Sequence, residues 1–285
     1  MLIAQITDCH IGFDPGNPDE DNVQRLRAVL AQLRDGPNRP DLLLLTGDLT
    51  NGGTAESYAR LASLLAECPI PYLLLAGNWD ERATLRAAFP DTASADGFVQ
   101  FELAFPGLRI IALDTTEPGR HGGAFCTARA AWLSAQLEAD PITPVLIAMH
   151  HPPIISGIDW MDGREQAPWT ERLRAALAGH PQVRAIIAGH LHRTVHTTFA
   201  GVPLSVCQSS APAVALDLRA IDPEQPDGRA MVQAEPPGYA LHRWSGGQFT
   251  SHFEVVPLGA PWPVLASYDA AMHQTVRTNA RERGG

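Results

Sequence analysis

The sequence contains no lysine, so all 21 of its basic residues are arginines, and these are scattered along a chain of 285 residues. Together with 31 acidic residues they give a formal net charge of −10. A groove that binds a nucleic-acid backbone needs clustered positive charge, so we expect no nucleic-acid partner. An acidic protein also repels an anionic substrate, unless bound metal cations reverse the field locally.

Cysteine is scarce as well: the four cysteines are widely spaced and form no C-x-x-C pair. This spacing favours neither a zinc ribbon nor a disulfide framework. No apolar run approaches the roughly 20 residues of a membrane helix, and the first residues have neither the basic charge nor the apolar length of a signal peptide. We therefore expect a cytoplasmic protein without a membrane partner.

Apolar residues make up 45% of the chain and charged residues 18%, the balance of a folded globular protein. Short apolar runs alternate with amphipathic segments, which is typical of strand–helix–strand units with parallel pairing. The predicted strands are Leu2–Thr7, Asp41–Leu45, Tyr72–Leu75, Arg109–Leu113, Val145–Met149 and Val183–Ala188. The predicted helices are Asp21–Arg34, Ala55–Glu67, Glu81–Phe89, Ala128–Ala139 and Trp169–Ala178.

The pattern changes after Gly189, where turn residues separate segments that favour antiparallel strands. These segments are Thr194–Phe199, Val202–Val206, Tyr239–Trp244 and Gln248–Val256. The stretch Asp222–Gly238 is rich in proline and acidic residues and is interpreted as a loop or lid. We predict a core over residues 1–205 and an extension over residues 206–285 that serves as a cap, a lid or an oligomer contact.

Side chains that can bind metal recur at one point of this pattern, directly after a predicted strand. In an open α/β sheet, ligands bind beyond the carboxyl ends of the strands. We therefore expect seven candidate ligands to converge on one edge: Asp8, His10, Asp48, Asn78, His150, His190 and His192.

Spacing within the motifs supports this convergence. Residues i and i+2 of an extended segment share a face, so Asp8 and His10 are expected to point together while Cys9 points away. The same reasoning joins His190 with His192. The glycines directly before ligands, Gly47, Gly77 and Gly189, suit sharp turns in which the backbone passes close to the site.

This set resembles the calcineurin-like metallophosphoesterase superfamily, whose pattern is D-x-H, GD, GNH-D/E, H and GHxH. The matching blocks, in the same order, are Asp8-Cys9-His10, Gly47-Asp48, Gly77-Asn78-Trp79-Asp80, His150 and Gly189-His190-Leu191-His192. Within the superfamily the chain is most similar to class III cyclic-nucleotide and glycerophosphodiester phosphodiesterases. The resemblance implies a four-layer α/β/β/α sandwich of two mixed sheets, with a dinuclear site at the strand ends and a small C-terminal β-rich cap.

The resemblance also implies a ligand set. One metal would be held by Asp8, His10, Asp48 and His192, and the second by Asp48, Asn78, His150 and His190. Oxygen and nitrogen ligands without thiolate favour Mn, Fe, Zn or Co. A metal-bridging hydroxide would attack the phosphorus of a small phosphodiester, a glycerophosphodiester or a 3′,5′-cyclic nucleotide, with Asp48, Asn78 and His192 as catalytic residues.

Residue 79 departs from the family pattern, because Trp79 stands where relatives have the histidine that protonates the leaving oxygen or binds phosphate. Indole cannot act as an acid near neutral pH. We expect Trp79, His121 and His151 to form the substrate-binding surface. His151 is expected to face away from the metals or to support their ligands.

Two alternatives remain open. A phosphomonoesterase or protein phosphatase of the same fold is disfavoured by Trp79 and by the lack of an obvious arginine clamp for phosphate. A non-catalytic scaffold would typically have lost ligands, whereas all seven positions are filled. Asp114 is expected to have a structural role. Five histidines outside the motifs are expected to be ordinary surface or loop residues: His180, His196, His242, His252 and His273.

Overall fold

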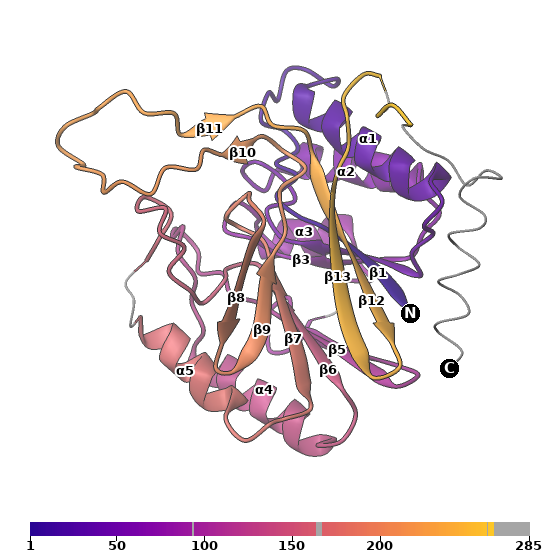
Figure 1. Cartoon of the computed structure of the whole chain (residues 1–285), viewed down its shortest axis with the longest axis vertical. Coiled ribbons are helices and arrows are strands. Elements are labelled where there is room, and N and C mark those ends of the chain that lie inside the picture. The colour runs from indigo at the N-terminus through magenta and orange to yellow at the C-terminus, as the bar shows by residue number, and fades with distance from the viewer. Residues whose placement is uncertain (93, 164–166, 261, 265–285) are drawn as a thin grey trace.

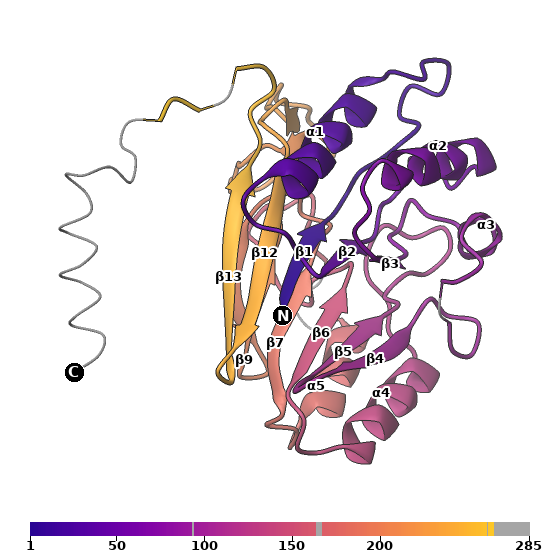
Figure 2. The same cartoon turned by 90° about the vertical axis from the view of Figure 1, so that its right-hand side faces the viewer.

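The computed structural model describes residues 1–92, 94–163, 167–260 and 262–264. Two mixed sheets pack face to face and helices cover their outer faces, as the two views in Figures 1 and 2 show. The predicted four-layer α/β/β/α arrangement is therefore confirmed. In the described ranges no helix combines the length and the apolar character that a membrane span requires.

The first sheet has the strand order β13-β12-β1-β2-β3. Its parallel strands are β1 (Leu2–Ile6), β2 (Leu42–Thr46) and β3 (Tyr72–Leu75). The hairpin of β12 (Gly238–Ser245) and β13 (Gln248–Val255) joins β1 in antiparallel pairing. The outer face of this first sheet is covered by α1 (Asp21–Asp35), α2 (Ala55–Ala66) and α3 (Arg82–Ala88).

The second sheet has the order β4-β5-β6-β7-β9-β8. Strands β5 (Leu108–Leu113), β6 (Val145–Met149), β7 (Val183–Ala188) and β9 (Val202–Val206) are parallel. The antiparallel edge strands are β4 (Phe101–Phe105) and β8 (Val195–Phe199). Helices α4 (Thr127–Ala139) and α5 (Pro168–Leu177) lie on its outer face.

The predicted strands and helices agree with the observed ones to within one residue at either end. Strand β4 was not predicted, because charged and small residues interrupt its apolar pattern. A short ladder of β10 (Ala213–Val214) and β11 (Val232–Gln233) was missed as well, and the loop between these strands projects from the body in Figure 1.

The place of the C-terminal hairpin differs from the expected boundary at residue 205. Strand β12 pairs with β1 from Leu2↔Arg243 to Gln5↔Ala240, and Tyr239 and Leu241 belong to the core beneath α1. The hairpin is therefore part of the core sheet, because it covers an edge of β1 that would otherwise lack hydrogen-bond partners. A role of the remaining extension as cap, lid or oligomer contact stays a prediction.

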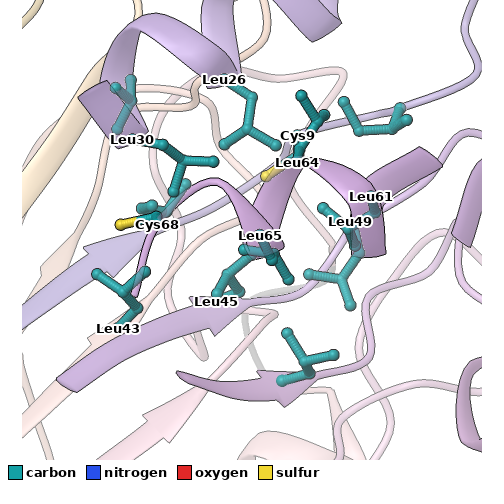
Figure 3. Close-up of a cluster of buried hydrophobic side chains, with 14 of the residues drawn as sticks. Cys9, Leu26, Leu30, Leu43, Leu45, Leu49, Leu61, Leu64, Leu65 and Cys68 are labelled. Atoms are coloured by element: carbon teal, nitrogen blue, oxygen red, sulfur yellow. The ribbon is translucent and has the colours of Figure 1, made fainter. Parts of the chain in front are cut away.

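Three apolar layers hold these elements together. One lies between the first sheet and its helices, one between the second sheet and its helices, and the third between the two sheets. Figure 3 shows the first of them, where leucines of α1 and α2 meet β2 and the side chain of Cys9. Both sheets are thus fixed rigidly, and the loops after their parallel strands are brought to one edge.

Candidate metal centre

All seven candidate ligands lie in loops that follow parallel strands at this edge. Backbone hydrogen bonds join the loops to one another. The N–H of Asp8 donates to the carbonyl of Gly47 and that of His10 donates to Asp48, both at 3.0 Å, and the N–H of Gly189 donates to His150 at 3.0 Å. The N–H of His190 also donates to Asp8 Oδ2 at 2.9 Å, which joins the loops of the two sheets around the candidate ligands.

The backbone is left-handed rather than extended at five of the seven candidate ligands. Asp8, His10, Asp48, His190 and His192 have φ between 47° and 72°. Asp8 and His10 were expected to share a face of an extended segment. The segment is not extended, so this premise was wrong, but the two side chains do lie close together. These left-handed residues redirect the chain after β1, β2 and β7. Positive φ in non-glycine residues is uncommon and concentrates at functional sites.

The glycines before the ligands allow the loops to approach closely. A Cβ atom at Gly77 would collide with the backbone N and the carboxylate of Asp48, and one at Gly189 would collide with the Thr7 hydroxyl. Gly47 has a φ of 91°, and its Cβ would lie 2.6 Å from the His150 ring. The predicted close approach of backbone at these three positions is confirmed.

The first group of ligands consists of Asp8, His10 and His192, whose nearest side-chain atoms lie within 4.8 Å of one another. His192 donates from Nδ1 to the carbonyl of Pro212 at 2.8 Å, which leaves Nε2 as the nitrogen that faces the site. That Nε2 lies 3.3 Å from Asp8 Oδ1 and 3.1 Å from His10 Nε2. Asp8 Oδ1 is buried and has no hydrogen-bond partner among the residues that the structure describes.

The second group is centred on Asp48 and His150. His150 donates from Nδ1 to the carbonyl of Thr46 at 2.8 Å, so its Nε2 faces the site. This Nε2 lies 3.4 Å from Asp48 Oδ2 and 3.2 Å from Asn78 Oδ1. Asp48 Oδ2 is also 3.6 Å from His10 Nε2, so Asp48 lies between the two groups. The His190 ring packs against that of His150, with centroids 5.2 Å apart.

The charges in this site depend on one another. Burial disfavours a charged His150, but Asp48 and Asp8 outweigh burial and raise the pKa of His150 to about 9. Burial, reinforced by repulsion from His150, lowers the pKa of His190 to about 3. Burial would raise the pKa of Asp8, but the surrounding histidines, His192 first, hold it well below its usual range. Two buried carboxylates are thus balanced by protons on histidines, and metal binding would displace such protons.

These observations fit a metal site. The donor set combines carboxylate, amide and imidazole groups. Two histidines are held by backbone carbonyls with their other nitrogen facing inward, as metal-ligating histidines usually are. The unpartnered oxygen of Asp8 would otherwise leave a buried polar atom unsatisfied.

A sequence profile of the calcineurin-like phosphoesterase family matches residues 1–194, a range that includes every candidate ligand. The chain belongs to the calcineurin-like phosphoesterase family. The predicted enzyme class, a metal-dependent phosphodiesterase, is confirmed by this family and by the relatives described next.

Two relatives cover most of the chain. A protein of Arcobacter nitrofigilis described as a probable glycerophosphodiester phosphodiesterase is 30% identical over 270 residues, which cover 92% of this chain and 96% of that protein. A cAMP/cGMP dual specificity phosphodiesterase of Mycobacterium tuberculosis is 36% identical over 220 residues, covering 73% of this chain and 67% of that one. Among solved structures, a purple acid phosphatase from yellow lupin seeds matches with a TM-score of 0.61 at 14% identity, covering 94% of this chain and 57% of that one, which shows a shared fold.

His151 lies at the site of the phosphoesterase rather than on its opposite side. Its Nε2 donates to the carbonyl of His121 at 2.9 Å and lies 3.1 Å from Asn78 Oδ1. Its Nδ1 is 2.9 Å from the hydroxyl of Thr115. Because Nε2 carries the proton, His151 has no free nitrogen for a metal, although it lies close to His150. The expected supporting position of His151 fits these contacts: it orients the amide of Asn78.

Asp80 organises the same loops, a role that the sequence analysis did not assign. Its two carboxylate oxygens accept from the N–H groups of Leu49, Thr50 and Gly77 at 2.9 to 3.1 Å. The hydroxyl of Tyr58 donates to Asp80 at 2.9 Å. Asp80 therefore ties the loop of Asp48 to the loop of Asn78. The available signal was the acidic residue that ends the GNH-D/E pattern.

Trp79 and His121 lie at the mouth of the site. Trp79 is 39% exposed, its ring meets the His10 ring edge-on at a centroid distance of 5.9 Å, and its backbone N–H donates to Asp48 Oδ1 at 2.8 Å. The His121 ring lies 5.5 Å from the Trp79 ring, and His121 Nδ1 is 3.3 Å from Asn78 Nδ2. The indole of Trp79 and the glycine-rich loop that carries His121 therefore both reach the site.

A cavity of about 490 Å³ opens beside the second group of ligands. It shares His151 and His190 with the site and continues along an apolar wall. The lining residues include Arg120, His151, Ile154, Met161, Trp169 and His190. An organic group attached to a phosphate held at the site could enter this cavity.

Several residues outside the site were also assigned from the sequence. Asp114 is fully buried and accepts two hydrogen bonds from Arg82, at 2.6 and 2.9 Å, which is the structural role expected. His242 was expected at the surface, and this was wrong: it is fully buried because β12 is an inner strand of the first sheet. His196 and His252 are exposed and His180 is half-buried, while His273 lies outside the described residues.

Proposed function

We propose that the phosphoesterase binds two metal ions through the seven side chains at the strand ends. Asp8, His10 and His192 would hold one ion, and Asn78, His150 and His190 would hold the other, with Asp48 shared between them. The observation that carries this proposal is the position of Asp48 Oδ2, 3.6 Å from His10 Nε2 and 3.4 Å from His150 Nε2.

When bound, such a metal pair supplies Lewis-acid stabilisation of phosphoryl oxygens and an acidified water at neutral pH. The residues of the chain hold that chemistry in place. Asp48, Asn78 and His192 would be catalytic residues because they touch the metals at which the ester reacts. His151 keeps the Asn78 oxygen turned inward. The lack of thiolate among the ligands favours Mn, Fe, Zn or Co, since Cys9 faces the apolar core.

We infer that the substrate is a small phosphodiester, either a glycerophosphodiester or a 3′,5′-cyclic nucleotide. A diester carries two organic groups and one negative charge. The exposed indole of Trp79 offers one of these groups a flat apolar face, and the cavity beside His151 and His190 accommodates the other. The names of the two bacterial relatives, which act on diesters of these two kinds, support the same substrate class.

Side-by-side assays test this proposal. Purified protein loaded with Mn²⁺ is offered bis(p-nitrophenyl) phosphate, p-nitrophenyl phosphate, glycerophosphocholine and cyclic AMP. We expect hydrolysis of the diesters to exceed that of the monoester, to vanish after treatment with a strong chelator, and to return with Mn²⁺ or Co²⁺. Equal turnover in rigorously metal-free protein, or a clear preference for the monoester, would contradict the proposal. A cytoplasmic location and an oligomer remain predictions.

A further inference from the structure

Gln5 is a polar exception in an apolar layer. In β1, Ala4 and Ile6 point to the helix-covered core, while Ile3 and Gln5 point between the two sheets. Gln5 is fully buried. A buried amide costs free energy unless its hydrogen bonds are made, so its partners show what the side chain does there.

All the polar atoms of the Gln5 side chain have partners. Nε2 donates to the hydroxyl of Thr46 at 2.8 Å and to the carbonyl of Ala188 at 2.9 Å. A carbonyl can only accept, so the amide orientation is fixed, and Oε1 must face His242 Nε2 at 3.0 Å. His242 therefore carries its proton on Nε2, and its Nδ1 accepts from the hydroxyl of Ser251 at 2.8 Å. The result is a closed buried network from β13 to the strand ends.

The two acceptors of Gln5 stand directly before candidate ligands on different sheets. Thr46 ends β2 and precedes Gly47 and Asp48, whereas Ala188 ends β7 and precedes Gly189 and His190. The carbonyl of Thr46 accepts from His150 Nδ1 as well. One amide thus spans the gap between the sheets immediately beneath the residues proposed to hold the second metal.

We propose that Gln5, held in its orientation by His242, is a positioning residue that sets the distance between the loops of Asp48 and His190 and so determines the affinity for the second metal. This inference rests on the proposed ligand set. A polar group that only filled the layer between the sheets would affect stability alone. A group that fixes the spacing of ligands also changes metal affinity, typically about 10- to 100-fold when such a supporting contact is lost.

Gln5→Met removes both donors and keeps the volume of the side chain. The matched control is Gln182→Met, because Gln182 is also buried, donates to a backbone carbonyl at 3.0 Å and lies at the opposite end of β7, away from the site. Stepwise Mn²⁺ binding is measured by titration calorimetry on metal-free protein, and stability by urea unfolding. We expect Gln5→Met to weaken one of the two binding steps about 10-fold, and Gln182→Met to change stability only.

His242→Phe provides a second variant in case Gln5→Met does not fold. It leaves the Gln5 amide in place but removes the group that orients it, so we expect a smaller loss in the same binding step. In the double variant the two losses should be less than additive, because the residues act as one unit.

The outcomes separate the inference from the ligand assignment. Suppose that the parent protein shows two Mn²⁺-binding steps. Unchanged affinities in both Gln5→Met and His242→Phe would then overturn the positioning role and leave the proposed ligand set standing. A parent protein that binds no Mn²⁺ would overturn both. The inference would also be overturned if Gln182→Met weakened Mn²⁺ binding as much as Gln5→Met does. The effect would then follow from a general loss of stability.

Discussion

Asp48 stands out among the individual residues, because its carboxylate lies between the two groups of ligands. We predict that Asp48→Ala prevents binding of both metals and lowers turnover at least about 10²- to 10³-fold, the scale on which one electrostatic group at a reacting centre acts. Bound metal is measured by elemental analysis after gel filtration. Cys9→Ala is the control, since Cys9 is also buried and lies in the neighbouring loop after β1, but faces the apolar core.

The control should lose some stability and no metal. Removing a buried sulfur atom leaves a small cavity, which costs on the order of 1 kcal/mol. If Cys9→Ala and Asp48→Ala lost metal equally, the assignment of Cys9 to the apolar face of its loop would be wrong.

Trp79 raises a separate question about the proton that the leaving group needs. With an indole at this position, rates should depend steeply on the pKa of the leaving group, since indole is no acid near neutral pH. We predict that Trp79→His raises the rate for a poor, alkyl leaving group by about 10²-fold, the lower end of general acid catalysis, and narrows the preference for diesters. A series of aryl and alkyl diesters measures this dependence.

Trp79→Phe is the matched control for this series, because it keeps an aromatic face without adding an acid. It should leave the dependence on leaving-group pKa as steep as in the parent. If Trp79→His also left both quantities unchanged while metal content stayed the same, Trp79 would have no part in handling the substrate.

Among the elements, the short loops after the strands carry the site, and their glycines limit what they tolerate. We predict that Gly189→Ala lowers stability by about 1–3 kcal/mol through overpacking and weakens metal binding. The reason is that its methyl group would press on the Thr7 hydroxyl and on Asp8 Oδ2, which accepts from the His190 N–H at 2.9 Å. Urea unfolding and Mn²⁺ titration measure the two effects.

Gly16→Ala is the matched control, since a Cβ at Gly16 meets nothing within 4 Å and its φ is not positive. This variant should bind metal as the parent does. A Gly189→Ala protein with unchanged metal affinity would show that the loop can shift without moving its ligands.

Strand β12 makes stability depend on pH through His242. Burial, with a smaller repulsion from His252, lowers the pKa of His242 to about 3, against about 6.5 in the unfolded chain. The neutral form is favoured in the folded state, so this contribution is fully present above pH 6.5 and is lost as pH falls towards 3. Between pH 6 and 4.5 one such group changes the free energy of unfolding by up to about 1.4 kcal/mol per pH unit.

We therefore predict that metal-free His242→Phe loses stability less steeply than the parent as the pH falls through this range, by up to that amount. Urea unfolding at half-unit pH steps measures the two slopes. Equal slopes would mean that His242 takes up a proton without unfolding. His196→Phe, at an exposed histidine of β8, is the control and should keep the parental slope.

For the whole molecule, the sequence was sufficient to predict the parallel strands other than β9, their helices and the convergence of the seven candidate ligands. Strand β9 was expected to be antiparallel, but it pairs in parallel with β7. Runs such as Leu42–Leu45 are apolar throughout, as buried parallel strands are, and five of the predicted runs are followed by a candidate ligand. The local geometry was not predictable in the same way. Left-handed φ at Asp8 or His190 could not be predicted from residue type, because aspartate and histidine are enriched in this conformation but adopt it at only a small share of their positions.

The pairing of strands that are distant in the chain could not be predicted from the sequence either. The segments of β12 and β13 were predicted as strands, but their place beside β1 depends on contacts between residues about 240 positions apart. For the same reason His242 was taken for a surface residue, although its partner is Gln5. Periodicity reports which side of a strand is buried, and it does not report which strand lies next to it.

The pairing of β1 with β12 has a consequence for the synthesis of the chain. Strand β1 is made first, yet one of its two neighbours, β12, is complete only when residue 245 has left the ribosome. Until then the edge of β1 is open, and Gln5 lacks its partner His242. The native first sheet therefore forms after translation of the hairpin, through contacts of long sequence separation that fold slowly. Nascent chains that stop short of residue 255 should be the ones that need chaperones.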